Sequence, residues 1–242
     1  MSLRSLRSAV EFLTVVPLGG TSRSPGGRLG RAYFPAVGAV VGLGAGVVFA
    51  LTSVVLPPLA AATAAVAWAA VLTGGLHLDG LADTADGLLA VSSPERRLEI
   101  MRDPRLGSFG VIALVLVVIG DIALLAAMPP ARALAGLVVA GALSRLALLG
   151  LVALIPYVRA DGLGVAATGG RRFVDLAVGA VLTLAVCLVD VRRSLLAALA
   201  VAIATALVVG LALRRIGGAT GDVYGACTEI GQLAALIVFA AH

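Results

Sequence analysis

Three aspartates between residues 74 and 87 carry the clearest chemical signal in the sequence. Asp79, Asp83 and Asp86 lie four and then three positions apart, and on an α-helix these offsets place all three carboxylates within roughly 60° on one face. Like charges on one helical face repel each other, and a divalent cation would remove that cost. Oxygen ligands favour Mg²⁺, Mn²⁺ or Ca²⁺ over Zn²⁺. The spacing therefore predicts a helical metal site, with a solvated acidic edge as the alternative.

His77 directly precedes this acidic triad. Its imidazole could bind the metal, carry a proton in catalysis, or simply make a hydrogen bond at the membrane interface. The sequence alone leaves these three roles open.

An arginine-rich stretch follows the triad. A guanidinium binds phosphate oxygens in a planar, bidentate way, and a metal together with arginine is a common means of neutralising charge in phosphoryl transfer. We therefore expect this stretch to bind phosphate, unless its arginines only fix the membrane topology. The residues concerned are Arg96, Arg97, Arg102, Asp103 and Arg105.

A second polar cluster lies near the C-terminal end of the sequence. Asp222 and Glu229 are seven positions apart, so a helix would align them. A carboxylate at membrane depth is costly and tends to be functional. We therefore expect both to be functional, and we treat Asp121 and Asp175 as structural. Further polar candidates are Arg145, as a counter-ion or a phosphate contact, and Arg159 and Thr220 as substrate contacts.

The composition shows what must position these groups. The chain of 242 residues is 60% hydrophobic and only 13% charged, with a mean hydropathy of +1.10. Soluble domains are about 45–50% apolar and about 25% charged, and disordered chains have the opposite balance. Aromatic residues make up only 4%, so Ala, Val and Leu supply the apolar runs. We predict an all-α, polytopic integral membrane bundle in one catalytic domain, 1–242.

A membrane-spanning helix needs about 20 mostly apolar residues. The pairs Pro57-Pro58 and Pro129-Pro130 predict tight helical hairpins, because proline ends one helix and can open the next. Residues 1–16 could form an interfacial amphipathic helix. We expect six or seven spans among the candidates 33–55, 59–76, 107–128, 131–155, 174–190, 194–213 and 226–242.

Arginine is distributed unevenly between the two sides of such a bundle. All eighteen basic residues are arginine, and the net charge of +5 points to lipid headgroups rather than nucleic acid. By the positive-inside rule the arginine-rich side is cytoplasmic; it includes the N-terminal segment 1–32 and a catalytic loop, 77–106. That side holds Arg4, Arg7, Arg23, Arg28, Arg31, Arg96, Arg97, Arg102, Arg105, Arg159, Arg171, Arg172, Arg214 and Arg215, against Arg132, Arg192 and Arg193 opposite.

These motifs resemble one family along the whole chain: the cobalamin synthases, which are adenosylcobinamide-GDP ribazoletransferases. The resemblance is most specific in the stretch 75–87, GLHLDGLADTADG, and continues in RLEIMRD at 97–103 and GSFG at 107–110. It also includes YFPAVG at 33–38, the segment 157–164 and TGDVYG at 220–225.

The resemblance implies a Mg²⁺-dependent transferase of the bacterial inner membrane, with Mn²⁺ as a substitute and the active site on the cytoplasmic side. It would join adenosylcobinamide-GDP to α-ribazole or its 5′-phosphate and release GMP. Asp79, Asp83 and Asp86, with Asp222 and Glu229, would bind the metal, while the arginines hold the phosphates. A carboxylate or His77 would accept the proton of the attacking hydroxyl.

Two other classes remain open at this stage. A CDP-alcohol phosphotransferase also combines an Asp cluster with Mg²⁺, but its acidic pairs are spaced differently from Asp79-Gly80-Leu81-Ala82-Asp83. A small-molecule transporter would place ionisable groups within its spans, whereas most acids here lie at span ends on one side.

The arginine asymmetry predicts that segment 77–106 faces the cytoplasm. Single cysteines at Ser92 and Ala131, in a background without Cys187 and Cys227, should react with an impermeant thiol reagent from opposite sides of the membrane. Labelling of Ser92→Cys in intact cells would contradict this orientation.

Overall fold

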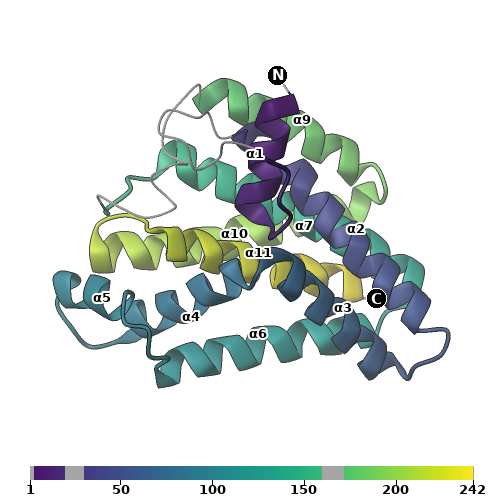
Figure 1. Cartoon of the computed structure of the whole chain (residues 1–242), viewed down its shortest axis with the longest axis horizontal. Helices are drawn as coiled ribbons and strands as arrows, with labels where there is room; N and C mark the ends of the chain where they lie inside the picture. Colours follow the sequence, from purple (N-terminus) through teal and green to yellow (C-terminus); the bar gives the residue numbers. More distant parts are fainter. Residues whose placement is uncertain (1–2, 20–29, 160–171, 242) are drawn as a thin grey trace.

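The computed structural model describes residues 3–19, 30–159 and 172–241, and these are almost entirely helical (Figure 1). Within these ranges the only β-type pairing is an isolated bridge between Tyr157 and Ala219. The all-α prediction is therefore confirmed. The elements are α1 (Leu3–Leu13), η1 (Arg31–Tyr33), α2 (Phe34–Thr52), α3 (Pro58–Thr73), α4 (Leu76–Leu89), α5 (Pro94–Ile100), α6 (Ser108–Ala126), α7 (Pro130–Leu154), α9 (Arg172–Cys187), α10 (Val191–Ile216) and α11 (Gly221–Ala240).

Five of these helices are long and apolar enough to cross a membrane: α2 together with η1, α6, α7, α10 and α11. Helices α3 and α4 add a sixth if they form one broken span, since they meet at an angle of 90°. The polytopic class is thus confirmed, with five or six spans in the described part of the chain. The segment predicted as a span at 174–190 forms a shorter apolar helix, α9.

The turns between the helices follow the local sequence. Pro58 and Pro130 are the first residues of α3 and α7, as the proline pairs predicted. Between α3 and α4, Gly74 and Gly75 have φ angles of +62° and +67°. Only glycine adopts this left-handed conformation easily, so the glycine pair permits the sharp bend.

Segment 77–106 is not the loop that the hydropathy pattern predicted. It contains most of α4 and all of α5, because its apolar residues recur at helical spacing and are buried against the bundle, as with Leu81 and Leu88. The last span also begins earlier than predicted, at Gly221 rather than 226. Asp222 therefore lies in the first turn of a spanning helix.

The N-terminal segment forms the expected amphipathic helix, α1, which lies across the bundle (Figure 1). Arg4 and Arg7 are exposed, and the ring of Phe12 stacks on Phe34 of α2. Arg31, the first residue of η1, forms an ion pair of 2.7 Å with Asp175 of α9. This contact agrees with a structural role for Asp175.

Small residues allow the helices to approach closely. Such close packing is usual in membrane proteins, because the hydrophobic effect does not drive helices together within lipid. Gly38 of α2 faces the backbone of Gly141 of α7. Helix α11 runs through the interior, packed against α4, α6, α7 and α10. Helices α4 and α11 meet at Gly80 and Gly225: a Cβ atom on Gly80 would lie 2.8 Å from the Asp222 carbonyl oxygen and 3.2 Å from Gly225 Cα.

The contact between α4 and α11 predicts a sharp difference between two glycine substitutions. Gly80→Ala should lower the melting temperature, because the new methyl group meets backbone atoms of α11 that cannot rotate away, and such overpacking costs about 1–3 kcal/mol. Gly210→Ala in α10 is the control, since nothing lies within 4 Å of its Cβ position; it should be neutral or stabilising. Thermal unfolding in detergent measures both, and a Gly80→Ala protein as stable as the wild type would refute the contact.

Candidate functional site

The acidic triad lies on one helix, α4, as predicted, but its three carboxylates have different surroundings. Asp79 is exposed, Asp83 is half-buried and Asp86 is buried. The charges acting on Asp83 include those of Asp222 and Arg159 as well as those of its own helix. Asp79 and Asp83 therefore face the start of α11, at the point where the two glycines bring the helices together.

Asp86 makes contacts that differ from those of the other two aspartates. One carboxylate oxygen accepts a hydrogen bond of 2.8 Å from the Gly107 amide, and the other accepts one of 2.9 Å from the Gly110 amide. These amides belong to the N-terminus of α6, where a negative charge is favourable. Asp86 thus ties α4 to α6, and the structure directs its carboxylate toward α6.

Asp222 is fixed by neighbours on two elements. Thr220 caps α11 by accepting a hydrogen bond from the Val223 amide, and its hydroxyl donates to Asp222 Oδ2 over 3.2 Å. The Arg159 guanidinium forms an ion pair of 2.8 Å with the same oxygen. Thr220 and Arg159, both predicted as substrate contacts, therefore lie with Asp222 at one end of the bundle.

The short segment before Arg159 is held against α11 by backbone hydrogen bonds. The Ala219 amide donates to the Pro156 carbonyl over 2.8 Å, and the Val158 amide donates to the Ala219 carbonyl over 3.0 Å. This bridge fixes where the arginine can reach. Arg159 also donates to the Met101 carbonyl over 3.4 Å, so it connects the end of α5 with the start of α11.

Glu229 and Arg145 belong to a separate, internal group. They line a cavity of about 40 Å³ between α6, α7 and α11, together with Asp121 and Gln232. Arg145 Nη1 donates to Gln232 Oε1 over 3.1 Å and to Ser144 Oγ over 3.0 Å. No contact of Glu229 or Arg145 with Asp79 or Asp83 is found among the described residues. The buried charge of Arg145 acts on Glu229 and on His77.

Arg97 is buried and donates only to backbone carbonyls among the contacts described. Its Nη1 donates to Gly87 and Leu88 over 3.1 and 2.7 Å, and its Nε donates to Ser92 over 3.0 Å. These groups lie at or just beyond the C-terminus of α4, where carbonyls lack helical partners. Arg97 therefore stabilises the end of the helix that carries the triad.

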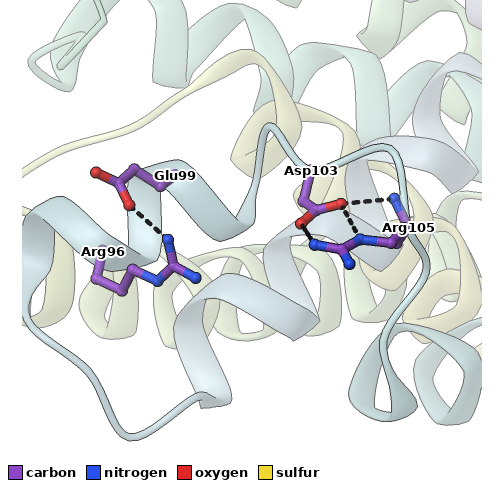
Figure 2. Close-up of polar contacts among 4 residues, drawn as sticks. All are labelled: Arg96, Glu99, Asp103 and Arg105. Carbon is purple, nitrogen blue, oxygen red and sulfur yellow. Dashed lines mark hydrogen bonds and ion pairs between the residues drawn. The ribbon is translucent and has the colours of Figure 1, made fainter.

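Two further arginines are exposed and pair with nearby acids (Figure 2). Arg96 forms an ion pair of 2.7 Å with Glu99, and Arg105 forms one of 2.7 Å with Asp103. Hydrogen bonds from Arg105 lower the pKa of the Asp103 carboxyl to about 2. Exposed ion pairs of this kind are weak, so a phosphate can compete for either guanidinium.

Arg102 is the member of the arginine-rich stretch that lies beside Arg159. The two side chains line a shallow cavity of about 170 Å³, and Arg102 is exposed. Arg102 thus adds a second guanidinium group beside Arg159, which pairs with Asp222. Arg23, Arg28, Arg171 and residues 160–164 of the sequence motifs lie outside the described residues.

A larger cavity, of about 190 Å³, opens beside the acidic site. His77 and Asp79 line it together with Asp222 and Arg159. No role was predicted for the aromatic residues in its walls, although three of them stand in the motifs YFPAVG, 157–164 and TGDVYG. These walls are Phe12, Phe34, Tyr157 and Tyr224.

The donor set fits a hard divalent cation only if the substrate supplies part of the coordination. Among the described residues, no three acidic, His or Cys side chains are grouped so as to hold one metal ion. Mg²⁺ usually binds through one or two carboxylates together with phosphate oxygens and water. Asp79 and Asp83, opposite Asp222, offer such a partial oxygen site.

Comparison with known proteins gives matches along nearly the whole chain. A family model described as cobalamin-5-phosphate synthase matches residues 5–240. A protein of Bradyrhizobium diazoefficiens named adenosylcobinamide-GDP ribazoletransferase is 38% identical over 99% of this chain and 94% of its own length. Proteins with the same name from Azorhizobium caulinodans and Stutzerimonas stutzeri are 42% and 39% identical, over 84% and 95% of this chain and 80% and 94% of their own. No solved structure matches the chain.

The different surroundings of Asp86 and Asp83 predict opposite effects on stability. Asp86→Asn places an amide group against one of two backbone amides, so one buried donor loses its acceptor, at a cost of about 1–3 kcal/mol. Asp83→Asn relieves repulsion among the acids, so stability without metal should stay unchanged or rise. Melting temperatures in EDTA measure both. Equal losses in the two variants would mean that Asp83 is also part of the scaffold.

Proposed function

Because the chain belongs to the cobalamin-5-phosphate synthase family, we propose that it is an adenosylcobinamide-GDP ribazoletransferase that catalyses a late step of cobalamin biosynthesis. The observation that carries the mechanism is the meeting of α4 and α11, which puts Asp79 and Asp83 opposite the Asp222–Arg159 pair. Acids that hold a metal beside arginines that hold phosphate are what phosphoryl transfer requires.

In the proposed reaction, a ribose hydroxyl of α-ribazole, or of its 5′-phosphate, attacks the pyrophosphate phosphorus attached to cobinamide. The new P–O bond forms as the bond to the GMP phosphate breaks, and GMP leaves. The hydroxyl proton passes to a base, for which Asp79, Asp83 and His77 are the candidates, since all three lie at the site.

Mg²⁺, or Mn²⁺ in its place, would neutralise the pyrophosphate charge when bound by Asp79 and Asp83, with Asp222 opposite. Arg159 is positioned to bind a phosphate oxygen, because it already forms an ion pair with an anionic oxygen of Asp222. Arg102 extends the same surface, so the two arginines can hold the phosphates of the GDP group.

The protein is a multi-pass membrane protein by the length and composition of its helices. We assign it to the bacterial inner membrane, with the site on the cytoplasmic side, because the arginine-rich segments lie on that side under the positive-inside rule. The family match also favours a ribazoletransferase over a CDP-alcohol phosphotransferase or a transporter.

The experiment is a GMP-release assay with adenosylcobinamide-GDP and α-ribazole, using protein purified in detergent. Activity should vanish in EDTA and return with Mg²⁺. Asp83→Asn should lower the rate by about 10²-fold or more, which is roughly 3 kcal/mol of transition-state stabilisation.

Asp121→Asn is the matched control, since Asp121 lies in the internal cavity; its rate should stay within a few-fold of the wild type. Full activity in excess EDTA would exclude the metal. Normal turnover of Asp83→Asn combined with loss in Asp121→Asn would show that the site is placed wrongly.

A further inference from the structure

The cavity of about 190 Å³ beside the acidic site is unusually rich in aromatic side chains. The chain has six Phe, three Tyr and one Trp, and four of these ten residues line this single cavity. They come from distant parts of the sequence, so the fold has to gather them. They are Phe12 on α1, Phe34 on α2, Tyr157 before Arg159, and Tyr224 on α11.

The four rings form two pairs. Phe12 and Phe34 are nearly parallel, with an interplanar angle of 4° and ring centroids 5.5 Å apart. Tyr157 and Tyr224 are tilted by 37°, with centroids 5.9 Å apart. Aromatic faces and edges at such spacings favour contact with a further flat ring. An aliphatic ligand would gain nothing from this geometry beyond burial.

The cavity is large enough for more than a single six-membered ring. An engineered apolar cavity of about 150 Å³ binds benzene, and this cavity is larger. It therefore has room for a ring system bigger than benzene. Leu148 and Val152 are buried and line the same space, so part of its wall is aliphatic and suits the apolar surface of such a ring.

One of the residues that line the cavity, His77, has a buried polar atom that the described protein leaves without a partner. His77 is 3% exposed, and its Nδ1 has no hydrogen-bond partner among the described residues. A buried polar atom of this kind is costly unless a partner is supplied. The lining also includes the charged side chains of Asp79, Arg159 and Asp222, so it suits a ring that carries donors and acceptors better than a hydrocarbon ring.

We infer that this cavity binds the flat heteroaromatic ring of a nucleoside substrate. Asp79, Arg159 and Asp222 line the same space, so a ring held there has its sugar and phosphate close to the reacting groups. If the proposed function is correct, two substrates carry such a ring: the benzimidazole of α-ribazole and the guanine of the GDP group. The shared chemistry defines the site, and binding experiments distinguish the two sources.

The test measures binding of α-ribazole and of GMP separately, by calorimetry, to protein purified in detergent. Phe12→Leu keeps apolar volume but removes an aromatic face, and it should weaken binding of one of the two ligands by about three- to tenfold. Phe12→Tyr keeps the face and should retain the affinity. Phe173→Leu is the control, because Phe173 is 80% exposed on α9.

Each outcome has a distinct meaning. Weaker binding of α-ribazole in Phe12→Leu assigns the cavity to the acceptor ring, and weaker binding of GMP assigns it to guanine. The inference is overturned if Phe12→Leu binds both ligands as the wild type does, or if Phe173→Leu, at an unchanged melting temperature, loses as much affinity. Because binding is measured without turnover, a failed GMP-release assay would contradict the proposed function and leave this result intact.

Discussion

The close approach of α4 and α11 is the constraint on which the rest of the site depends. A Cβ atom on Gly225 would lie 3.0 Å from the His77 carbonyl oxygen and 3.2 Å from Gly80 Cα, so the two helices touch through their backbones. Side chains on either side of this contact are forced together. Asp79 and Asp83 from α4 thereby meet Asp222 from α11, although more than 130 residues separate them in the sequence.

The structure divides its charged residues into groups with different tasks. Asp86 accepts hydrogen bonds from backbone amides at the start of α6, and Arg97 of α5 donates to backbone carbonyls at the C-terminus of α4. Both contacts hold the C-terminal part of α4 in place despite the repulsion among its carboxylates. Asp121, Glu229 and Arg145 form a buried group between the spans, where each charge would be costly without the others. Asp79, Asp83 and Asp222 lie at the third place, near Arg159, where we propose that the reaction occurs.

The sequence was sufficient for the fold class and for part of the site. Helical periodicity predicted that Asp79, Asp83 and Asp86 share a helix, and proline pairs predicted the hairpins, because both signals are local. Hydropathy could not distinguish a loop from the buried helix α4, since that helix carries three acids. The different roles of Asp86 and Arg97 depend on backbone groups supplied by other segments, and the aromatic cavity depends on packing between α1, α2 and α11. Such non-local contacts leave no trace in residue spacing.

The central claim is that Asp79 and Asp83 share a metal ion with the substrate's phosphates, while Asp86 serves only the scaffold. Electron paramagnetic resonance of Mn²⁺ tests it directly, with purified protein titrated in the presence and absence of adenosylcobinamide-GDP. The account predicts that tight Mn²⁺ binding requires the nucleotide substrate, is lost in Asp83→Asn, and persists in folded Asp86→Asn protein. Equal Mn²⁺ binding in Asp83→Asn and wild type, or loss only in Asp86→Asn, would contradict it.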